Sequence, residues 1–347
     1  MKSSLPRVVV AGCIALTVSA CAPEEETPAE SGVEEINDWR TPPSTPTSSG
    51  VAAQYEIPGP DLFPEGGAYD PVGRAFYLGS LVSDTVSRLG VDRAFRTVVP
   101  SSGRAGRATL GMKVDAARRR LWACTVRIDG TRTTDGAVRV VDLTTNTVLR
   151  EVALSTAAPG ASCNDLALDA SGDAYVTDRE NPRIYRVTAD GVARVWTENS
   201  RLAPEQVGLN GAAFTTDGQY LLVVKYLPAR LLRVSVADPS RVDTVMLRGD
   251  TFSGGVHFLN GADGMAFVGS DLYVAFGAKV ARVRPDSARW DRATVATESG
   301  WTGLTAITSV DGEPYAVQGQ AVRRLLRVAP SRPFRVVRLL RSWFDAP

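Results

Sequence analysis

The amino-acid sequence predicts an all-β fold, a six-bladed β-propeller with four antiparallel strands in each blade. One observation is a motif that recurs six times, a polar residue beside a turn glycine ahead of a short apolar strand. Another is the spacing of about 40 to 55 residues between copies, which is typical of propeller blades. The content of 31 Gly and 21 Pro also favours many turns and short strands. The positions that mark the copies are Gly66, Gly111, Asp165, Gly211, Gly264 and Gly303.

The N-terminus is predicted to be an export signal over residues 1–20. Lys2 and Arg7 precede an apolar run that is too short to span a bilayer. The run ends in Ser19-Ala20-Cys21, which resembles a bacterial lipobox and implies cleavage before Cys21 and lipidation of its thiol. We therefore expect an exported protein, periplasmic or on the cell surface, held to a membrane by acyl chains. The alternative is a soluble secreted protein with an ordinary signal-peptidase site.

Residues 21–50 are predicted to be a disordered tether after the lipidated cysteine. They are rich in Pro, Ser, Thr and Glu, with the acidic triplet Glu24 to Glu26 and few apolar side chains. Such a composition buries too little surface to offset the entropy lost on ordering.

The propeller is predicted to occupy residues 51–347, without a second domain. In the first blade the strand patterns cover 67–70, 75–79, 85–89 and 96–99, and the third and fourth repeats show the same order. A β-sandwich gives no reason for one recurring motif, and a parallel β-helix has a much shorter period. Either Ala52 to Ile57 or Phe334 to Leu340 is expected to supply the outer strand that closes the ring.

Composition excludes several classes of function. The net charge of the 347 residues is +1, so a nucleic-acid partner is not expected. We also expect the protein to be a monomer. The Arg118 to Arg120 stretch is interpreted as a turn, and Arg323 with Arg324 as a solvated strand face. The single histidine, His257, excludes a His-rich zinc site, and any His-dependent nucleophile must use it.

The polar residues of the motif are predicted to converge at one mouth of the central channel, because the first strand of each blade lines that channel. Glu65, Asn210 and Asp263 offer oxygen ligands, and Asn164 with Asp165 offers more. Oxygen ligands without Cys or His suit one hard cation, with Ca²⁺ the first choice and Mg²⁺, Mn²⁺ or Zn²⁺ as alternatives. The competing interpretation is that these residues are only turn formers. Blade 2, with Lys113 in its strand, is expected to contribute only walls.

With these motifs the chain resembles the SMP-30/gluconolactonase/LRE-like family of six-bladed propellers. The resemblance implies one divalent metal held by Glu65, Asn210 and Asp263, with Asn164 on the substrate side. It departs from the sugar lactonases at Ser162 and Cys163, where those members have an Arg shortly before the substrate-side Asn. Sugar lactones are thus in doubt as substrates.

Two further features bear on the mouth. Cys124 and Cys163 are predicted to lie at the same end of neighbouring blades, and in an exported protein a disulfide is expected between them. The alternative is a pair of free buried thiols. His257 lies in a glycine-bearing loop six residues before Asp263, so it is a candidate substrate contact together with Asn164 and Asp165. The alternative is a loop histidine without a special role.

Two functions follow from these residues, and a third is remote. The first is a metal-dependent hydrolase of lactones or related esters acting on a small molecule at the mouth, with Asp263 as metal ligand and general base. The second is a tethered propeller that binds a ligand or protein without turnover and whose metal is structural. A condensation like that of strictosidine synthase lacks a clear catalytic acid.

Overall fold

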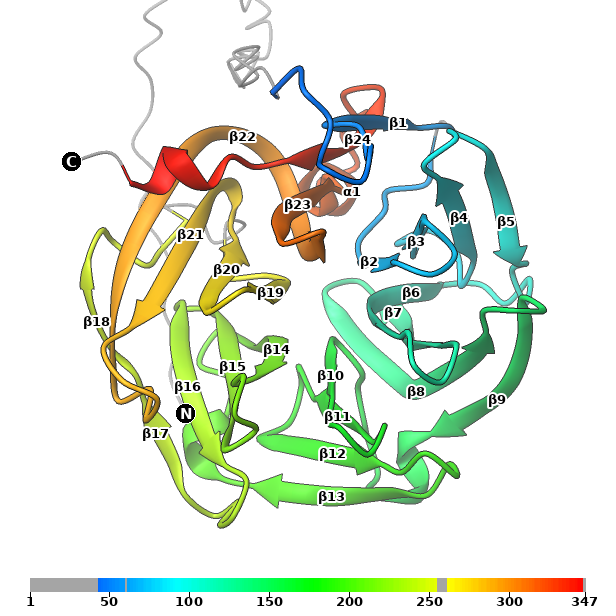
Figure 1. Cartoon of the computed structure of the whole chain (residues 1–347). Coiled ribbons are helices and arrows are strands. Elements are labelled where there is room, and N and C mark those ends of the chain that lie inside the picture. Colours follow the sequence, from blue (N-terminus) through cyan, green and yellow to red (C-terminus); the bar gives the residue numbers. More distant parts are fainter. Residues whose placement is uncertain (1–42, 60, 255–260, 346–347) are drawn as a thin grey trace, which may run out of the picture. The chain divides into compact units, whose positions relative to one another are not determined.

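The computed structural model describes residues 43–59, 61–254 and 261–345. Within these residues the strands form six antiparallel blades arranged around a central channel (Figure 1). The predicted all-β propeller is therefore confirmed. Export, lipidation at Cys21 and the role of His257 concern residues outside the described part of the chain.

The first four blades are separate four-stranded sheets, each built from consecutive strands with the first strand innermost (Figure 1). Blade 1 consists of β2 (Gly67–Asp70), β3 (Ala75–Leu78), β4 (Val86–Gly90) and β5 (Phe95–Val99). Blade 2 consists of β6 (Arg107–Asp115), β7 (Arg120–Asp129), β8 (Arg132–Asp142) and β9 (Thr147–Ala153). Blade 3 consists of β10 (Leu166–Leu168), β11 (Ala174–Thr177), β12 (Arg183–Val187) and β13 (Ala193–Glu198). Blade 4 consists of β14 (Val207–Phe214), β15 (Tyr220–Leu227), β16 (Arg230–Ser235) and β17 (Val242–Thr244).

Blades 5 and 6 share one long strand. Blade 5 consists of β19 (Met265–Val268), β20 (Asp271–Ala275), β21 (Gly277–Pro285) and the first half of β22 (Arg292–Val310). Its outer edge also pairs, in parallel, with β18 (Met246–Gly249). The second half of β22 is the inner strand of blade 6, followed by β23 (Glu313–Gln318), β24 (Phe334–Arg338) and β1 (Gln54–Ile57). The outer strand that closes the ring is thus N-terminal, and the Phe334 segment lies one position further in.

Apolar side chains form the core in the spaces between blades. The described residues contain six clusters of buried apolar side chains, one between each pair of neighbouring blades. The short predicted strands are therefore buried on both faces, which is why every residue of β3 and β11 is buried instead of every second one. Each blade depends on its neighbours to cover its faces.

The motif glycines mark contacts between blades. We expected them to form turns, but Gly66 and Gly111 have ordinary backbone angles. A side chain at Gly66 would meet the Leu110 carbonyl of the next blade, and one at Gly111 would meet Asp165 of the blade after. The Gly111 amide also donates to the Asn164 carbonyl at 2.9 Å. Glycine recurs because inner strands approach closely around a narrow channel.

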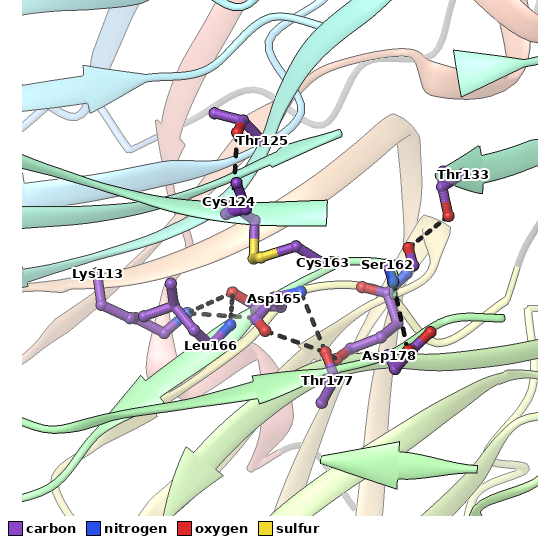
Figure 2. Close-up of a disulfide and its surroundings, with 12 residues drawn as sticks. Lys113, Cys124, Thr125, Thr133, Ser162, Cys163, Asp165, Leu166, Thr177 and Asp178 are labelled. Carbon is purple, nitrogen blue, oxygen red and sulfur yellow. Dashed lines mark hydrogen bonds and ion pairs between the residues drawn. A yellow bond between two sulfur atoms is a disulfide. The ribbon is translucent and has the colours of Figure 1, made fainter. Parts of the chain in front are cut away.

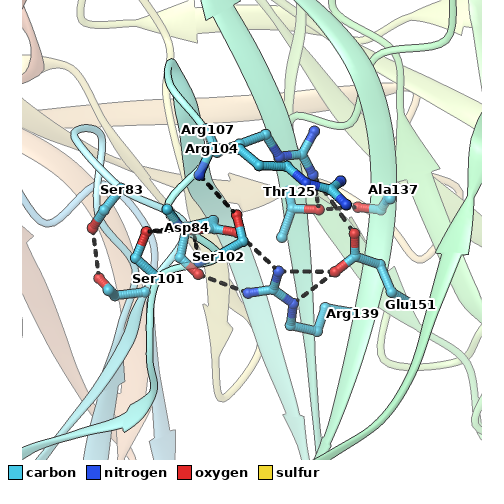
Figure 3. Close-up of polar contacts among 12 residues, drawn as sticks. Ser83, Asp84, Ser101, Ser102, Arg104, Arg107, Thr125, Ala137, Arg139 and Glu151 are labelled. Atoms are coloured by element: carbon cyan, nitrogen blue, oxygen red, sulfur yellow. Dashed lines mark hydrogen bonds and ion pairs between the residues drawn. The ribbon is translucent and has the colours of Figure 1, made fainter.

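A buried ion pair links blades 1 and 2 at the mouth side (Figure 3). Asp84, in the β3–β4 loop, accepts hydrogen bonds from Ser101 and from the Ser102 amide, and Arg139 of β8 contacts it at 3.2 Å. Burial opposes ionisation of Asp84, but hydrogen bonds from Ser102, Ser101 and Arg139 lower its pKa to about 2. Asp84 is therefore a carboxylate that stabilises the ring at neutral pH.

Two peripheral segments differ from expectation. Part of the predicted tether contacts the ring, since Thr47 is buried and donates to Asp311 at 3.0 Å in the β22–β23 turn. Arg323 and Arg324 lie in a short helix, α1 (Ala321–Leu325), and not on a strand face. This helix is an insertion between β23 and β24, and its residues belong to no sheet. No helix in the described part of the chain is long and apolar enough to cross a bilayer.

Ring closure by β1 can be tested at Tyr55. Its ring is 1% exposed and packs on Phe76 of blade 1 at 5.4 Å between centroids. We predict that Tyr55→Ala lowers the free energy of unfolding by about 3–5 kcal/mol, because it leaves a cavity between blades 6 and 1. Glu56→Ala, on the exposed face of the same strand, should change it little. Urea unfolding measures both, and equal effects would contradict closure through Tyr55.

Candidate functional site

The polar heads of the motif line one cavity at the channel mouth. Glu65, Asn164, Asn210 and Asp263 all contribute to its wall, together with Asp165 and Lys113. The four predicted residues come from blades 1, 3, 4 and 5 and are at least nine-tenths buried. The volume of the cavity is about 10 Å³, which is close to the volume that a single water molecule requires. It is therefore the size of one small ion or one water.

The carboxyl groups of Glu65 and Asp263 are buried away from solvent. Burial is the main cause that raises the pKa of Glu65 well above its ordinary value, followed by the charges of Asp263 and Asp165. Burial likewise raises the pKa of Asp263 to about 7, against hydrogen bonding from Asn210 that lowers it. The two groups repel each other and favour protonation when nothing lies between them. A cation in the cavity would reverse both effects.

The donor set fits a hard cation. The lining offers carboxylates and amide oxygens and, among the described residues, no thiolate or imidazole, which matches what Ca²⁺ or Mg²⁺ prefers; its only sulfur atoms are the thioethers of Met112 and Met265. Nowhere in the described residues do three or more His, Cys, Asp or Glu side chains form a metal-holding group. The candidate set must therefore draw on the amides of Asn210 and Asn164 as well as on carboxylates.

Asn164 presents an unpaired polar atom. Its Nδ2 is buried and has no hydrogen-bond partner in the described part of the chain. Its backbone is fixed, because the amide donates to the Thr177 carbonyl at 3.0 Å and the carbonyl accepts from Gly111. A buried amide without a partner is costly, and an incoming oxygen atom would satisfy it. This suits the predicted place of Asn164 on the substrate side.

Asp165 is held inside the protein. Lys113 of β6 contacts both of its carboxylate oxygens at 3.3 Å, as Figure 2 shows. The Leu166 amide donates to Oδ1 at 2.8 Å, and the Ala212 amide of blade 4 donates to Oδ2 at 3.3 Å. Asp165 thus ties blades 2, 3 and 4 together beside the cavity. Its oxygens are already engaged, unlike the Nδ2 of Asn164.

The role of Lys113 departs from expectation, since blade 2 contributes a charge and not only walls. Lys113 stands two residues after Gly111, so both lie on the same face of the strand. That period of two, counted from the motif glycine, is the signal that would have placed it in the channel. Arg179 is a second cation near the mouth, in the loop after β11, and its charge lowers the pKa of both Glu65 and Asp263.

The predicted disulfide between Cys124 and Cys163 is present (Figure 2). It joins β7 to the residue immediately before Asn164, and both sulfur-bearing residues are fully buried. Next to it, Ser162 hydrogen-bonds Thr133 of β8 at 2.6 Å, and its amide donates to Asp178 at 3.3 Å. The segment that carries Asn164 is thereby fixed on both sides.

Comparisons with known proteins confirm the fold. No family model matches the sequence, and no curated protein matches it. Among solved structures, the Malassezia sympodialis allergen Mala s 1 is similar at a TM-score of 0.63 and 18% identity, over 84% of this chain and 96% of that one. A gluconolactonase from Xanthomonas campestris is similar at 0.57 and 16%, over 87% and 96%. Virginiamycin B lyase from Staphylococcus aureus is similar at 0.52 and 11%, over 83% and 98%.

The raised pKa of Asp263 predicts how stability depends on pH without metal. A carboxyl group whose pKa rises from 3.8 to about 7 on folding binds more protons in the folded state. The free energy of unfolding should therefore fall as pH rises from about 4 to about 7, by an amount on the order of a few kcal/mol. Thermal unfolding in chelator checks this, and added Ca²⁺ should restore stability at pH 7.

Asp263→Asn is the control for this dependence. It removes one of the two buried carboxyl groups, so it should reduce the decline between pH 4 and pH 7 and leave only the part that Glu65 contributes. A wild-type protein whose stability rises over this interval, in parallel with the variant, would contradict the buried carboxyl pair.

The disulfide predicts a second stability effect. It closes a sequence separation of 39 residues, so the double variant Cys124→Ser with Cys163→Ser should lose about 4 kcal/mol of unfolding free energy. Chemical denaturation of oxidised wild type and variant measures the difference. Alkylation of Cys124 and Cys163 themselves, mapped by peptide mass spectrometry on unreduced, denatured wild-type protein, would show that the bridge does not form.

Proposed function

We propose that this protein is a divalent-metal-dependent hydrolase that opens lactones or related ester bonds at the propeller mouth. The observation that carries the proposal is the pair of buried carboxyl groups, Glu65 and Asp263, on one ion-sized cavity. Neither forms an ion pair with any described residue, whereas Asp165 beside them is neutralised by Lys113. A buried acid pair without an opposite charge beside it is unfavourable unless a cation or a proton binds there.

The cation would be held by Glu65, Asn210 and Asp263. When bound, it would polarise a substrate carbonyl and promote ionisation of a water. Asn164 would donate its free Nδ2 hydrogen to an oxygen of the substrate and so orient the carbonyl. Asp263 would accept a proton from the attacking water, since its carboxylate lies at the cavity. Asp165 with Lys113 would position the segment that carries Asn164.

The similar gluconolactonase supports this reaction class by its fold and by nothing more specific. It suggests that a propeller of this build can carry lactone chemistry. The present chain has Ser162 and Cys163, in a disulfide-bonded segment, where the sugar lactonases have an Arg. We therefore propose a substrate other than a simple sugar lactone, with Arg179 as the cation available at the mouth.

Substitution of the two carboxylates tests the proposal. We predict that Glu65→Gln and Asp263→Ala each lower Ca²⁺ affinity and reduce hydrolysis at least 100-fold, because each removes a charged ligand. Isothermal titration with Ca²⁺ and a panel of lactones and aryl esters measure both. The matched control is Glu313→Gln, at the end of blade 6 opposite the mouth, which should leave both unchanged. Full turnover by chelated wild-type protein would contradict the proposal.

The second candidate is a binding propeller whose cation is structural. The observation that favours it is the size of the cavity, which accommodates an ion but no organic group beside it. In that case the cation raises the thermal stability of the wild type, the carboxylate variants lose this effect, and no member of the panel is hydrolysed. The two candidates thus share the metal and differ in turnover.

We propose further that the protein is exported and anchored through a lipid on Cys21. The disulfide supports this, because bridges of this kind persist in oxidising compartments and are rare in the cytosol. Mass spectrometry of the membrane fraction tests it. The expected species begins at an acylated Cys21 and loses the lipid when Cys21 is replaced by Ser.

A further inference from the structure

The insertion between β23 and β24 forms an arm on the rim of the channel mouth (Figure 1). We call residues 321–332 the rim arm; it contains α1 and the loop after it. The strand before it ends at Gln318, whose partner Leu304 lies at the mouth end of blade 6. Gly319, which begins the insertion, lies against the Pro64 carbonyl, next to Glu65. The rim arm thus stands beside the candidate site.

The rim arm is held in place at its base. Gln320 is 1% exposed, its Nε2 donates to the Ser331 carbonyl at 2.6 Å, and its Oε1 accepts from the Ser331 amide at 2.8 Å. Arg332 forms an ion pair with Asp61 at 3.0 Å, which joins the arm to the segment before Glu65. The tip is therefore presented in a defined position.

The tip of the rim arm is apolar and exposed. Leu325, Leu326 and Val328 are 44%, 53% and 42% exposed. They make up three of the nine large apolar side chains that are exposed in the described part of the chain, and they fall within four consecutive positions. Exposed apolar side chains that cluster in this way indicate a contact surface, whereas single scattered ones do not.

The same segment is basic. Arg323 donates to the Ala329 carbonyl at 2.9 Å, while Arg324 and Arg327 are exposed and form no ion pair with a described residue. Arg327 also has a φ of 58° at the end of the helix, a position that glycine or asparagine usually occupies.

We propose that the rim arm docks on the surface of an anionic phospholipid bilayer. Leu325, Leu326 and Val328 would enter the interface, and Arg324 and Arg327 would contact phosphate groups. Charge complementarity favours this occupant. A second copy of this chain is basic at the same place, and three side chains fall far short of the roughly 800 Å² per partner of a stable interface. An acidic protein would match the arginines but gives no reason for adjacent exposed leucines. Docking turns the channel mouth toward the lipid, whatever reaction occurs there.

Vesicle co-sedimentation tests the docking. The chain used begins at Ala22, which keeps every described residue and the closed ring but removes Cys21 and the apolar run before it. We expect binding to vesicles of phosphatidylcholine with one quarter phosphatidylglycerol, and at least tenfold weaker binding to phosphatidylcholine alone. Arg324→Glu with Arg327→Glu should weaken binding about 20-fold or more, because each arginine near an anionic surface contributes several-fold. Leu325→Ser with Leu326→Ser should weaken it about tenfold.

Two matched controls separate the site from general effects. Arg96→Glu with Arg194→Glu changes the net charge equally, at exposed positions on the outer strands β5 and β13. Val148→Ser with Leu149→Ser removes an equally exposed apolar pair from β9. Both should bind vesicles like the parent chain. The proposal is overturned if the parent does not prefer the anionic vesicles, if the controls weaken binding as much as the arm variants, or if the arm variants abolish self-association instead of vesicle binding.

Discussion

The structure depends on one constraint: the closed ring forces acidic side chains from different blades into a narrow, water-poor mouth. Glu65 and Asp263 are separated by most of the sequence, yet each raises the cost of ionising the other. An isolated pair of this kind destabilises a fold. The burial of both groups is explained if a cation binds between them and balances their negative charge.

The residues around the mouth separate the acidic pair, Glu65 and Asp263, from the neutral donor, Asn164. Lys113 neutralises Asp165 and leaves Glu65 and Asp263 without a counter-ion from the described residues. The disulfide at Cys163 and the amide contacts of Asn164 fix a hydrogen-bond donor next to them. The result is one acidic position sized for an ion, with a neutral donor at its edge. That asymmetry is what the proposed hydrolysis of a carbonyl compound would require.

Much of the fold could be predicted because a propeller repeats. The period of the motif determines the number of blades, and the inner position of each first strand brings Glu65, Asn210 and Asp263 to one place. Gly66 and Gly111 were assigned the wrong cause, since close approach between blades is a property of the ring and not of the local sequence, whereas Gly303 has the positive φ of a turn glycine. Which terminal segment forms the outer strand also depends on the whole ring, because both candidates read as strands.

The details that escaped prediction are those set by side-chain direction or by insertions. Lys113 reaches Asp165 across a blade boundary, which no single repeat reveals. The rim arm carries its basic and apolar residues in pairs, without a clear helical period, and its helix of five residues has no side-chain cap to signal it. It also exposes Leu325 and Leu326 beside the mouth, so the surface next to the candidate site is apolar and basic. If lipid lies against that surface, the mouth opens onto an interface, and the compounds that reach it are enriched in amphiphiles.

The central claim is that one divalent cation lies between Glu65 and Asp263, and the most direct test is a crystal structure grown with Mn²⁺ and measured at its absorption edge. We predict a single anomalous peak in the cavity, about 2.2 Å from oxygens of both carboxylates, with the Asn210 amide oxygen turned toward it. A structure at saturating Mn²⁺ with no anomalous density between the two carboxyl groups would contradict the account.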